Sequence, residues 1–240
     1  MTYTHSTQIV LESYPIAPKA ALIISMFQEN VPLSEHSNYK IGGPAKYFLM
    51  ADNAQQITDA VSAAKSQKLP ILILGGGTNI LFSDTGFDGL VIKPNLKALK
   101  QEGNNVRVGA GVSVEELLNF TLEKKLAGLE WAGGLPGSVG GAIYGNAGAF
   151  GGETKDRLME VTSLNISGKK PEVFVRTNAK AKFAYRNSVF KENAANGKQE
   201  VILAAMFELV PGEEQKIKEV MDSRRQYRKD RHPIEYPNIG

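Results

Sequence analysis

The residues best placed to do chemistry are glycines, gathered in a stretch with no charged side chain. Residues 133–152, the long glycine segment, hold nine of the chain's 24 glycines. Without a Cβ, glycine lets backbone N–H groups approach a flat or anionic ligand closely. Leu135, Val139, Ile143 and Phe150 interrupt these glycines, and such apolar side chains indicate a folded segment rather than a flexible linker. We expect this segment to cradle a ligand; the alternative is a turn that packs closely against another backbone.

A short glycine segment (residues 75–82) directly follows the apolar run 71–74. A buried strand that ends in a glycine turn can point backbone amides at a diphosphate. The segment is not a P-loop, because no Gly-Lys-Ser/Thr follows, and Ile80 stands where the third glycine of G-x-G-x-x-G would be. The dinucleotide-binding folds that carry these motifs are therefore disfavoured. A tight turn that only reverses the chain is the alternative to a ligand loop.

Arg186 is the candidate for holding an anionic substrate. It stands in Phe-Ala-Tyr-Arg-Asn-Ser (residues 183–188), between an aromatic and two small polar residues. Its guanidinium could hold a carboxylate or an enolate through two hydrogen bonds, which a lysine would do less well. An ordinary exposed arginine is the alternative.

Sequence periodicity outlines the elements that must position these residues. Apolar side chains recur with helical spacing over 52–68 and again after Ser113, where Ser113 and Glu116 form a capping-box pattern. A third helix begins at Glu213 and Glu214 and has arginines in its last turns, which complements the helix dipole. Strands are predicted at 71–74, 89–93, 106–108, 161–166, 173–175 and 201–210. Helices and strands alternate in the first half and strands dominate the second, so we predict an α+β fold of two subdomains around a cofactor crevice.

Composition limits the class of protein. The 240 residues are 42% hydrophobic and 22% charged, which is typical of a globular chain, and no apolar run reaches the roughly 20 residues of a membrane helix. With no cysteine, three scattered histidines and no visible export signal, we expect no metal site and a cytoplasmic location. A net charge of +3 fits a small anionic substrate. We predict a monomer with no nucleic-acid or membrane partner.

Seven short motifs occur in the order and spacing of one enzyme family. They are Asn-Tyr-Lys-Ile-Gly-Gly (38–43), Leu-Gly-Gly-Gly-Thr-Asn-Ile-Leu-Phe (74–82), Gly-Ala-Gly (109–111), Gly-Leu-Glu (128–130), Leu-Pro-Gly-Ser-Val-Gly-Gly (135–141), Asn-Ala-Gly (146–148) and Tyr-Arg-Asn-Ser (185–188). Over residues 37–240 the chain resembles MurB, the family of UDP-N-acetylenolpyruvoylglucosamine reductases of peptidoglycan synthesis, in its shorter form.

The resemblance implies an FAD-binding fold of the vanillyl-alcohol-oxidase type, with NADPH as hydride source and a UDP-sugar as substrate. The diphosphate of FAD is implied to lie around residues 75–80 and the isoalloxazine against residues 135–142. The residues that match cofactor-binding positions are Tyr39, Gly75, Gly76, Gly77, Thr78, Asn79, Ile80, Leu135, Pro136, Gly137, Ser138, Gly141, Ala142, Asn146 and Gly148.

Substrate contacts are implied as well. Arg186 matches the catalytic arginine that stabilises negative charge on the substrate carboxylate, and Tyr185 beside it is expected to bind substrate. A basic run (residues 224–231) contains Arg224, Arg225, Arg228, Lys229 and Arg231. Either this run is a solvated helix end, or part of it faces the UDP diphosphate, in which case Lys229 and Arg231 are the predicted contacts.

The resemblance also implies a division of the chain. We expect an N-terminal extension (1–20), two FAD-binding subdomains (21–95 and 96–211) and the beginning of a substrate domain (212–240). In the family, the serine that donates a proton follows the position of Gly240, and a catalytic glutamate lies further on. The 240 residues are therefore expected to bind FAD but to be catalytically incomplete. A non-catalytic FAD-binding module and another FAD-linked oxidase are the alternatives.

Overall fold

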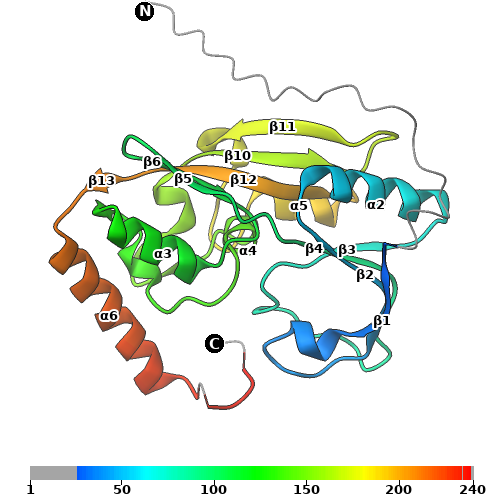
Figure 1. The fold of residues 1–240 in the computed structure, drawn as a ribbon, viewed down its shortest axis with the longest axis horizontal. Helices are drawn as coiled ribbons and strands as arrows, with labels where there is room; N and C mark the ends of the chain where they lie inside the picture. Colours follow the sequence, from blue (N-terminus) through cyan, green and yellow to red (C-terminus); the bar gives the residue numbers. More distant parts are fainter. Residues whose placement is uncertain (1–25, 234, 239–240) are drawn as a thin grey trace, which may run out of the picture.

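The computed structural model describes residues 26–233 and 235–238 (Figure 1). The predicted N-terminal extension, residues 1–20, lies outside these described residues. Two main β-sheets with helices packed on them form the fold, so the α+β prediction is confirmed. In the part of the chain that the structure describes, no helix combines the length and apolar character needed to cross a membrane.

The first sheet carries the short glycine segment at its edge. Its strand order is β1 (Gln28–Pro32), β2 (Pro44–Ala51), β4 (Phe87–Pro94), β3 (Ile71–Ile73). The last three strands run parallel, and β1 runs antiparallel to β2. Since the carboxyl ends of parallel strands meet at one edge of a sheet, the glycines that follow β3 lie near Lys93, which is close to the end of β4.

The second sheet is antiparallel throughout. Its strand order is β11 (Glu172–Thr177), β10 (Leu158–Asn165), β12 (Glu200–Glu208), β6 (Asn105–Gly109), β5 (Leu99–Glu102). Helix α2 (Ala54–Ser66) packs against both sheets. Its buried Ile57 and Val61 lie in one apolar core with Leu90 of β4 and Leu203 of β12. The two sheets are therefore joined by a common apolar core.

The remaining helices pack on a second apolar core of the second sheet, distinct from the one that α2 shares. They are α3 (Val114–Glu123), α4 (Val139–Tyr144), α5 (Val189–Ala195) and α6 (Glu214–Arg231). Two short strand pairs, β7 (Leu126–Ala127) with β13 (Val210–Pro211) and β8 (Gly148–Ala149) with β9 (Gly152–Glu153), and four 3₁₀ turns, Leu33–His36, Glu130–Ala132, Thr154–Asp156 and Asn178–Ala181, complete the fold. Figure 1 shows α6 beside α3, and Ile217 and Met221 of α6 are buried in the same core as Leu118.

Local sequence patterns predicted several of these elements. Helices α2, α3 and α6 and strands β3, β4, β6, β10 and β11 lie where they were predicted. The capping box of α3 is present: Ser113 Oγ accepts a hydrogen bond from Glu116 N–H at 3.0 Å, and Glu116 Oε2 accepts one from Ser113 N–H at 2.6 Å. The predicted strand 201–210 is divided into β12 and β13, and strand β2 and helix α4 were not predicted.

Candidate cofactor site

The two glycine segments contact one another backbone to backbone. A Cβ on Gly76 would lie 2.6 Å from the Cα of Gly137, and one on Gly75 would lie 2.8 Å from Ser138 Oγ. Gly137 has a φ of 111°, which other residues rarely adopt. Close packing, the structural alternative considered for the long glycine segment, therefore explains some of its glycines. It brings the two segments predicted to hold one ligand against each other.

A cavity of about 440 Å³ opens where the two glycine segments meet. Six of the predicted cofactor residues line it: Gly75, Gly76, Thr78, Pro136, Gly137 and Ser138. The other lining residues are Asn38, Met50, Lys93, Pro94, Asn95, Lys97, Gly111 and Ser113. A second cavity of about 440 Å³ shares Asn38 and Pro136 with the first. The two cavities are therefore neighbours, and a long ligand could extend from one toward the other.

Two lysines, Lys93 and Lys97, line the first cavity. Lys93 is half-buried, and this burial, together with the positive charges of Lys97 and Lys40, lowers the pKa of its ammonium group. Lys97 pairs with Glu116 at 3.0 Å, whereas Lys93 has no carboxylate partner among the described residues. A ligand with phosphate groups would supply the missing negative charge. Sequence reasoning missed Lys93; its place at the carboxyl end of a buried parallel strand is the signal that could have found it.

The other predicted cofactor residues lie around this space. Ser138 caps α4 by accepting a hydrogen bond from Gly141 N–H at 3.3 Å, which places Gly141 and Ala142 on the first turns of the helix. Leu135 and Ala142 pack on the core beneath. The backbone N–H of Tyr39 donates to Ser37 Oγ at 3.2 Å. Gly77 is buried, Ile80 packs against the core of the first sheet, and Asn79 is exposed.

Arg186 stands at the tip of a two-residue turn. The backbones of Ala184 and Asn187 exchange hydrogen bonds of 3.1 Å, so Tyr185 and Arg186 form the tip. Arg186 has a φ of 53°, in the left-handed region. Its Nη2 donates to Gly148 O at 2.8 Å, and its guanidinium carbon lies 5.5 Å from the centre of the Tyr185 ring. Both side chains are exposed, so the remaining guanidinium donors are free to meet a ligand.

Gly148 and Asn146 lie at this arginine rather than at the cavity. Gly148 provides the carbonyl that Arg186 binds. Asn146 is 0% exposed, and its amide bonds to the backbone oxygen of Ala184 at 2.9 Å. In this conformation the Asn146 side chain has no surface left with which to touch a ligand.

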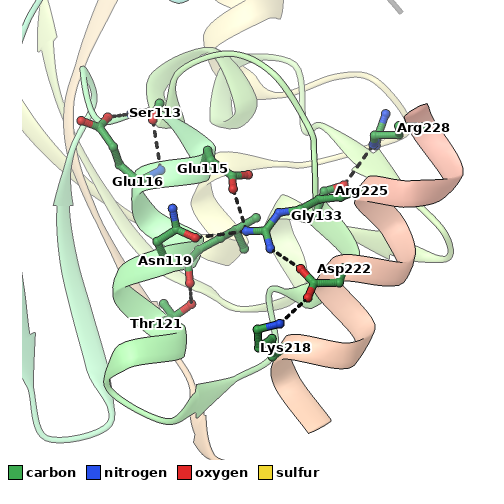
Figure 2. A network of polar contacts seen from close by, with 11 residues as sticks. Ser113, Glu115, Glu116, Asn119, Thr121, Gly133, Lys218, Asp222, Arg225 and Arg228 are labelled. Atoms are coloured by element: carbon green, nitrogen blue, oxygen red, sulfur yellow. Dashed lines mark hydrogen bonds and ion pairs between the residues drawn. The ribbon is translucent and has the colours of Figure 1, made fainter. Parts of the chain in front are cut away.

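The arginines of the basic run have different surroundings on α6 (Figure 2). Arg225 donates to Glu115 at 2.6 Å and to Asp222 at 2.7 Å, and so holds α6 against α3. Arg228 Nε donates to Gly133 O at 3.2 Å, and Arg228 lines the second cavity. Burial there lowers the pKa of Arg228.

The two predicted substrate contacts of the basic run, Lys229 and Arg231, do not line the second cavity. Lys229 and Arg231 are exposed, and Arg231 lies over the ring of Tyr227 at 5.3 Å. Arg224 lies over the ring of Phe150 at 4.5 Å. Of the five basic side chains, Arg228 is therefore the one that the structure brings to the cavity wall.

These features fit a flavin dinucleotide. Glycine amides at the end of a buried strand and an unpaired lysine suit a diphosphate, and an uncharged glycine-rich helix start suits a flat ring. A model of the FAD binding domain matches residues 45–170, so the fold and site define an FAD-binding oxidoreductase. The chain belongs to the family of UDP-N-acetylenolpyruvoylglucosamine reductases, as its similarity to curated relatives shows.

Two such relatives illustrate that similarity. The reductase of Lactobacillus delbrueckii subsp. bulgaricus is 39% identical over 214 residues, which cover 89% of this chain and 69% of the relative. The reductase of Caldanaerobacter subterraneus subsp. tengcongensis is 35% identical over 212 residues, covering 88% of this chain and 68% of the relative. The chain thus spans a little over two thirds of their length.

Solved structures share the fold. MurB of Thermus caldophilus superposes with a TM-score of 0.73 at 24% identity, covering 89% of this chain and 73% of that one. A solvent-stable cholesterol oxidase superposes with a TM-score of 0.57 at 13% identity, covering 78% of this chain and 37% of that one. The predicted two-part FAD-binding fold is confirmed by these comparisons.

Proposed function

We propose that the protein reduces the enolpyruvyl group of UDP-N-acetylenolpyruvoylglucosamine through FAD, with NADPH as the hydride source. Family membership supports the reaction. The observation that carries the proposal is the cavity where the two glycine segments meet, lined by Lys93, which has no carboxylate partner among the described residues. An uncharged nucleoside or sugar would leave this half-buried ammonium without a counter-charge.

The cofactor would be held by residues from both segments. Backbone amides of residues 75–80 and the ammonium of Lys93 would bind the diphosphate. Residues 135–142 would lie against the isoalloxazine, where glycine allows close backbone approach. The bound flavin would supply the hydride transfer that no amino-acid side chain can perform. Tyr39, Gly141 and Ala142 keep their proposed cofactor role, whereas Asn146 and Gly148 lie at Arg186 and are given none.

Arg186 would bind the substrate carboxylate. One of its guanidinium donors is engaged by Gly148 O, which fixes the plane of the group and leaves other donors for two oxygens of an anion. Tyr185, exposed beside it, would contact the substrate from the same turn. Charge that develops on the carboxylate during reduction would be stabilised by this fixed cation.

The basic run would meet the UDP diphosphate. Lys229 and Arg231 keep this proposed role from their exposed positions, and Arg228 is added because it lines the second cavity. We further propose that the chain is a cytoplasmic monomer, with FAD-binding subdomains at 21–95 and 96–211 and a substrate domain that begins at 212.

The 240 residues are proposed to bind FAD and to accept hydride from NADPH. The family resemblance assigns proton donation to a serine and a glutamate that match no position within these residues. Among the residues described here, the proposal therefore gives Arg186 an electrostatic role and gives none the role of proton donor.

Absorbance spectroscopy tests this proposal. The purified chain is mixed with FAD, freed of excess cofactor and treated with NADPH without oxygen; we expect a flavin spectrum that NADPH bleaches. Protein that takes up no FAD would overturn the proposal. A non-catalytic module would keep its flavin oxidised, and an FAD-linked oxidase would be reduced by an alcohol or sugar rather than by NADPH. Lys93→Met is the matched variant, expected to bind FAD more weakly with an unchanged fold.

A further inference from the structure

The turn that presents Arg186 is attached to the end of a helix that begins at the cofactor cavity. Ser138, which lines the cavity, caps α4, and the six-residue helix ends at Tyr144, followed by its C-cap Gly145. Asn146 follows with a φ of 44°, a left-handed conformation that asparagine tolerates better than most residues. A helix of this length spans about 9 Å. The contacts between the C-terminal end of α4 and the Arg186 turn therefore determine how far Arg186 lies from the cavity.

Asn146 makes that junction. Its Nδ2 donates to Ala184 O at 2.9 Å and to Glu153 Oε2 at 3.3 Å. Its Oδ1 accepts a hydrogen bond from Lys155 N–H at 3.1 Å. The residue is 0% exposed, so water cannot replace a lost partner. One buried amide thus ties the end of α4 to strand β9, to the 3₁₀ turn 154–156 and to the first residue of the Arg186 turn.

We propose that Asn146 is a positioning residue for Arg186. It holds the Tyr185–Arg186 turn to the end of α4 through Ala184, and so fixes the guanidinium relative to the cofactor cavity without touching the cofactor. The consequence for substrate rests on the proposed function, because it takes Arg186 as the carboxylate contact. The attachment of the turn does not depend on that assumption.

Other side-chain contacts hold the Arg186 turn at different points from the Asn146 amide. Ser188 Oγ also ties the motif to α4, by donating to Tyr144 O at 2.7 Å, but it lies after the turn. Lys191 Nζ donates to Arg186 O at 3.0 Å from an exposed position. Before the turn, among the described residues, Asn146 provides the side-chain bond to Ala184. Its loss would weaken the attachment of that arm, which would then depend on the backbone pair of Ala184 with Asn187 and on the bond from Arg186 to Gly148 O.

Limited proteolysis tests the attachment, because trypsin cleaves after arginine and Arg186 is exposed. Asn146→Gly removes the side chain and keeps the left-handed backbone, and Asn146→Asp keeps the acceptor for Lys155 N–H but has no donor for Ala184 O. We expect either variant to raise the initial rate of cleavage after Arg186 about tenfold, with other sites unchanged. Ser163→Ala, which removes a buried hydroxyl in β10, is the control for general destabilisation and should leave this rate unchanged.

Two further measurements separate positioning from cofactor contact. The FAD affinity of Asn146→Gly should stay within about twofold of the wild type, since the side chain does not reach the cavity. The affinity of the FAD-loaded chain for UDP-N-acetylmuramate should fall in Asn146→Gly and in Arg186→Ala, and the double variant should bind no more weakly than Arg186→Ala alone.

Each result bears on one claim. An unchanged cleavage rate after Arg186 in both Asn146 variants, or a tenfold loss of FAD affinity in Asn146→Gly, would overturn the positioning role. A wild-type chain that binds neither FAD nor UDP-N-acetylmuramate would instead overturn the proposed function, and the proteolysis result would still decide the role of Asn146.

Discussion

Replacing Gly141 by alanine should show whether this glycine is needed for FAD binding rather than for packing of the protein. Gly141 lies in α4 and is exposed, and the nearest atom to an added Cβ, apart from the helix backbone, is Ser138 Oγ at 3.4 Å, an ordinary contact. Alanine in a helix is favoured over glycine by about 0.5–1 kcal/mol. The cofactor-free variant should therefore unfold at the same or slightly higher denaturant concentration than the wild type.

FAD binding should respond in the opposite direction. If the isoalloxazine lies against α4, a methyl group on Gly141 overlaps it, and overpacking of this kind costs about 1–3 kcal/mol. That cost corresponds to a loss of affinity of about fivefold to 150-fold. Titration of the cofactor-free protein with FAD, followed by flavin fluorescence, measures it. Gly145→Ala is the matched control, because its added Cβ meets nothing closer than 3.8 Å.

Gly76→Ala supplies the contrasting result. Its Cβ would lie 2.6 Å from the Cα of Gly137, so the cofactor-free protein itself should lose about 1–3 kcal/mol of unfolding free energy. Wild-type FAD affinity in Gly141→Ala would refute the placement of the flavin against α4. A loss of stability in that variant, before any cofactor is added, would refute the claim that Gly141 is free of packing constraints.

Three further predictions concern charge. Hydrogen bonds from the Ser113 backbone and side chain lower the pKa of Glu116 to about 2, so this carboxylate stabilises the fold at neutral pH. Its contribution to the free energy of unfolding should fall as the pH drops from about 4.5 to about 2. Urea unfolding should show this as a shrinking difference in stability between the wild type and Glu116→Gln. Glu200→Ala should cost about 3 kcal/mol in the same assay, because it leaves the largely buried Arg176, now paired at 2.6 Å, without its partner; replacing both residues by apolar ones should cost less. Lys93→Met should weaken FAD binding about tenfold at low salt and reduce its salt dependence, while the cofactor-free protein keeps its stability.

Local signals explain what the sequence predicted well. The capping box lies within residues 113–116 and the apolar run before Gly75 within residues 71–74, so neither pattern depends on distant partners. Helix α4 was missed because glycine is a poor helix former. That helix exists because Ser138 caps it and because Val139 and Ile143 are buried in the core of the second sheet, which only the folded chain brings to it.

The candidate site was harder to predict, because its walls come from distant parts of the chain. The motifs identified the glycines, but they could not show that Gly76 faces Gly137 or that Lys93 lines the same cavity. Family position suggested a cofactor role for Asn146. Its burial and its bond to Ala184 became visible only in three dimensions.

The long glycine segment therefore serves three purposes along its length. Near its start, Gly133 leaves room for α6: a Cβ there would lie 3.0 Å from that of Arg224. In the middle, Ser138 at the start of α4 lines the cavity, and the exposed Gly141 lies in the first turn of the helix. Near its end, Asn146 attaches the turn of Arg186. Because one short helix joins the second and third of these, a ligand that packs on α4 and stabilises it should also stabilise the turn of Arg186. We therefore expect FAD to slow tryptic cleavage after Arg186, although no cofactor atom needs to touch that turn.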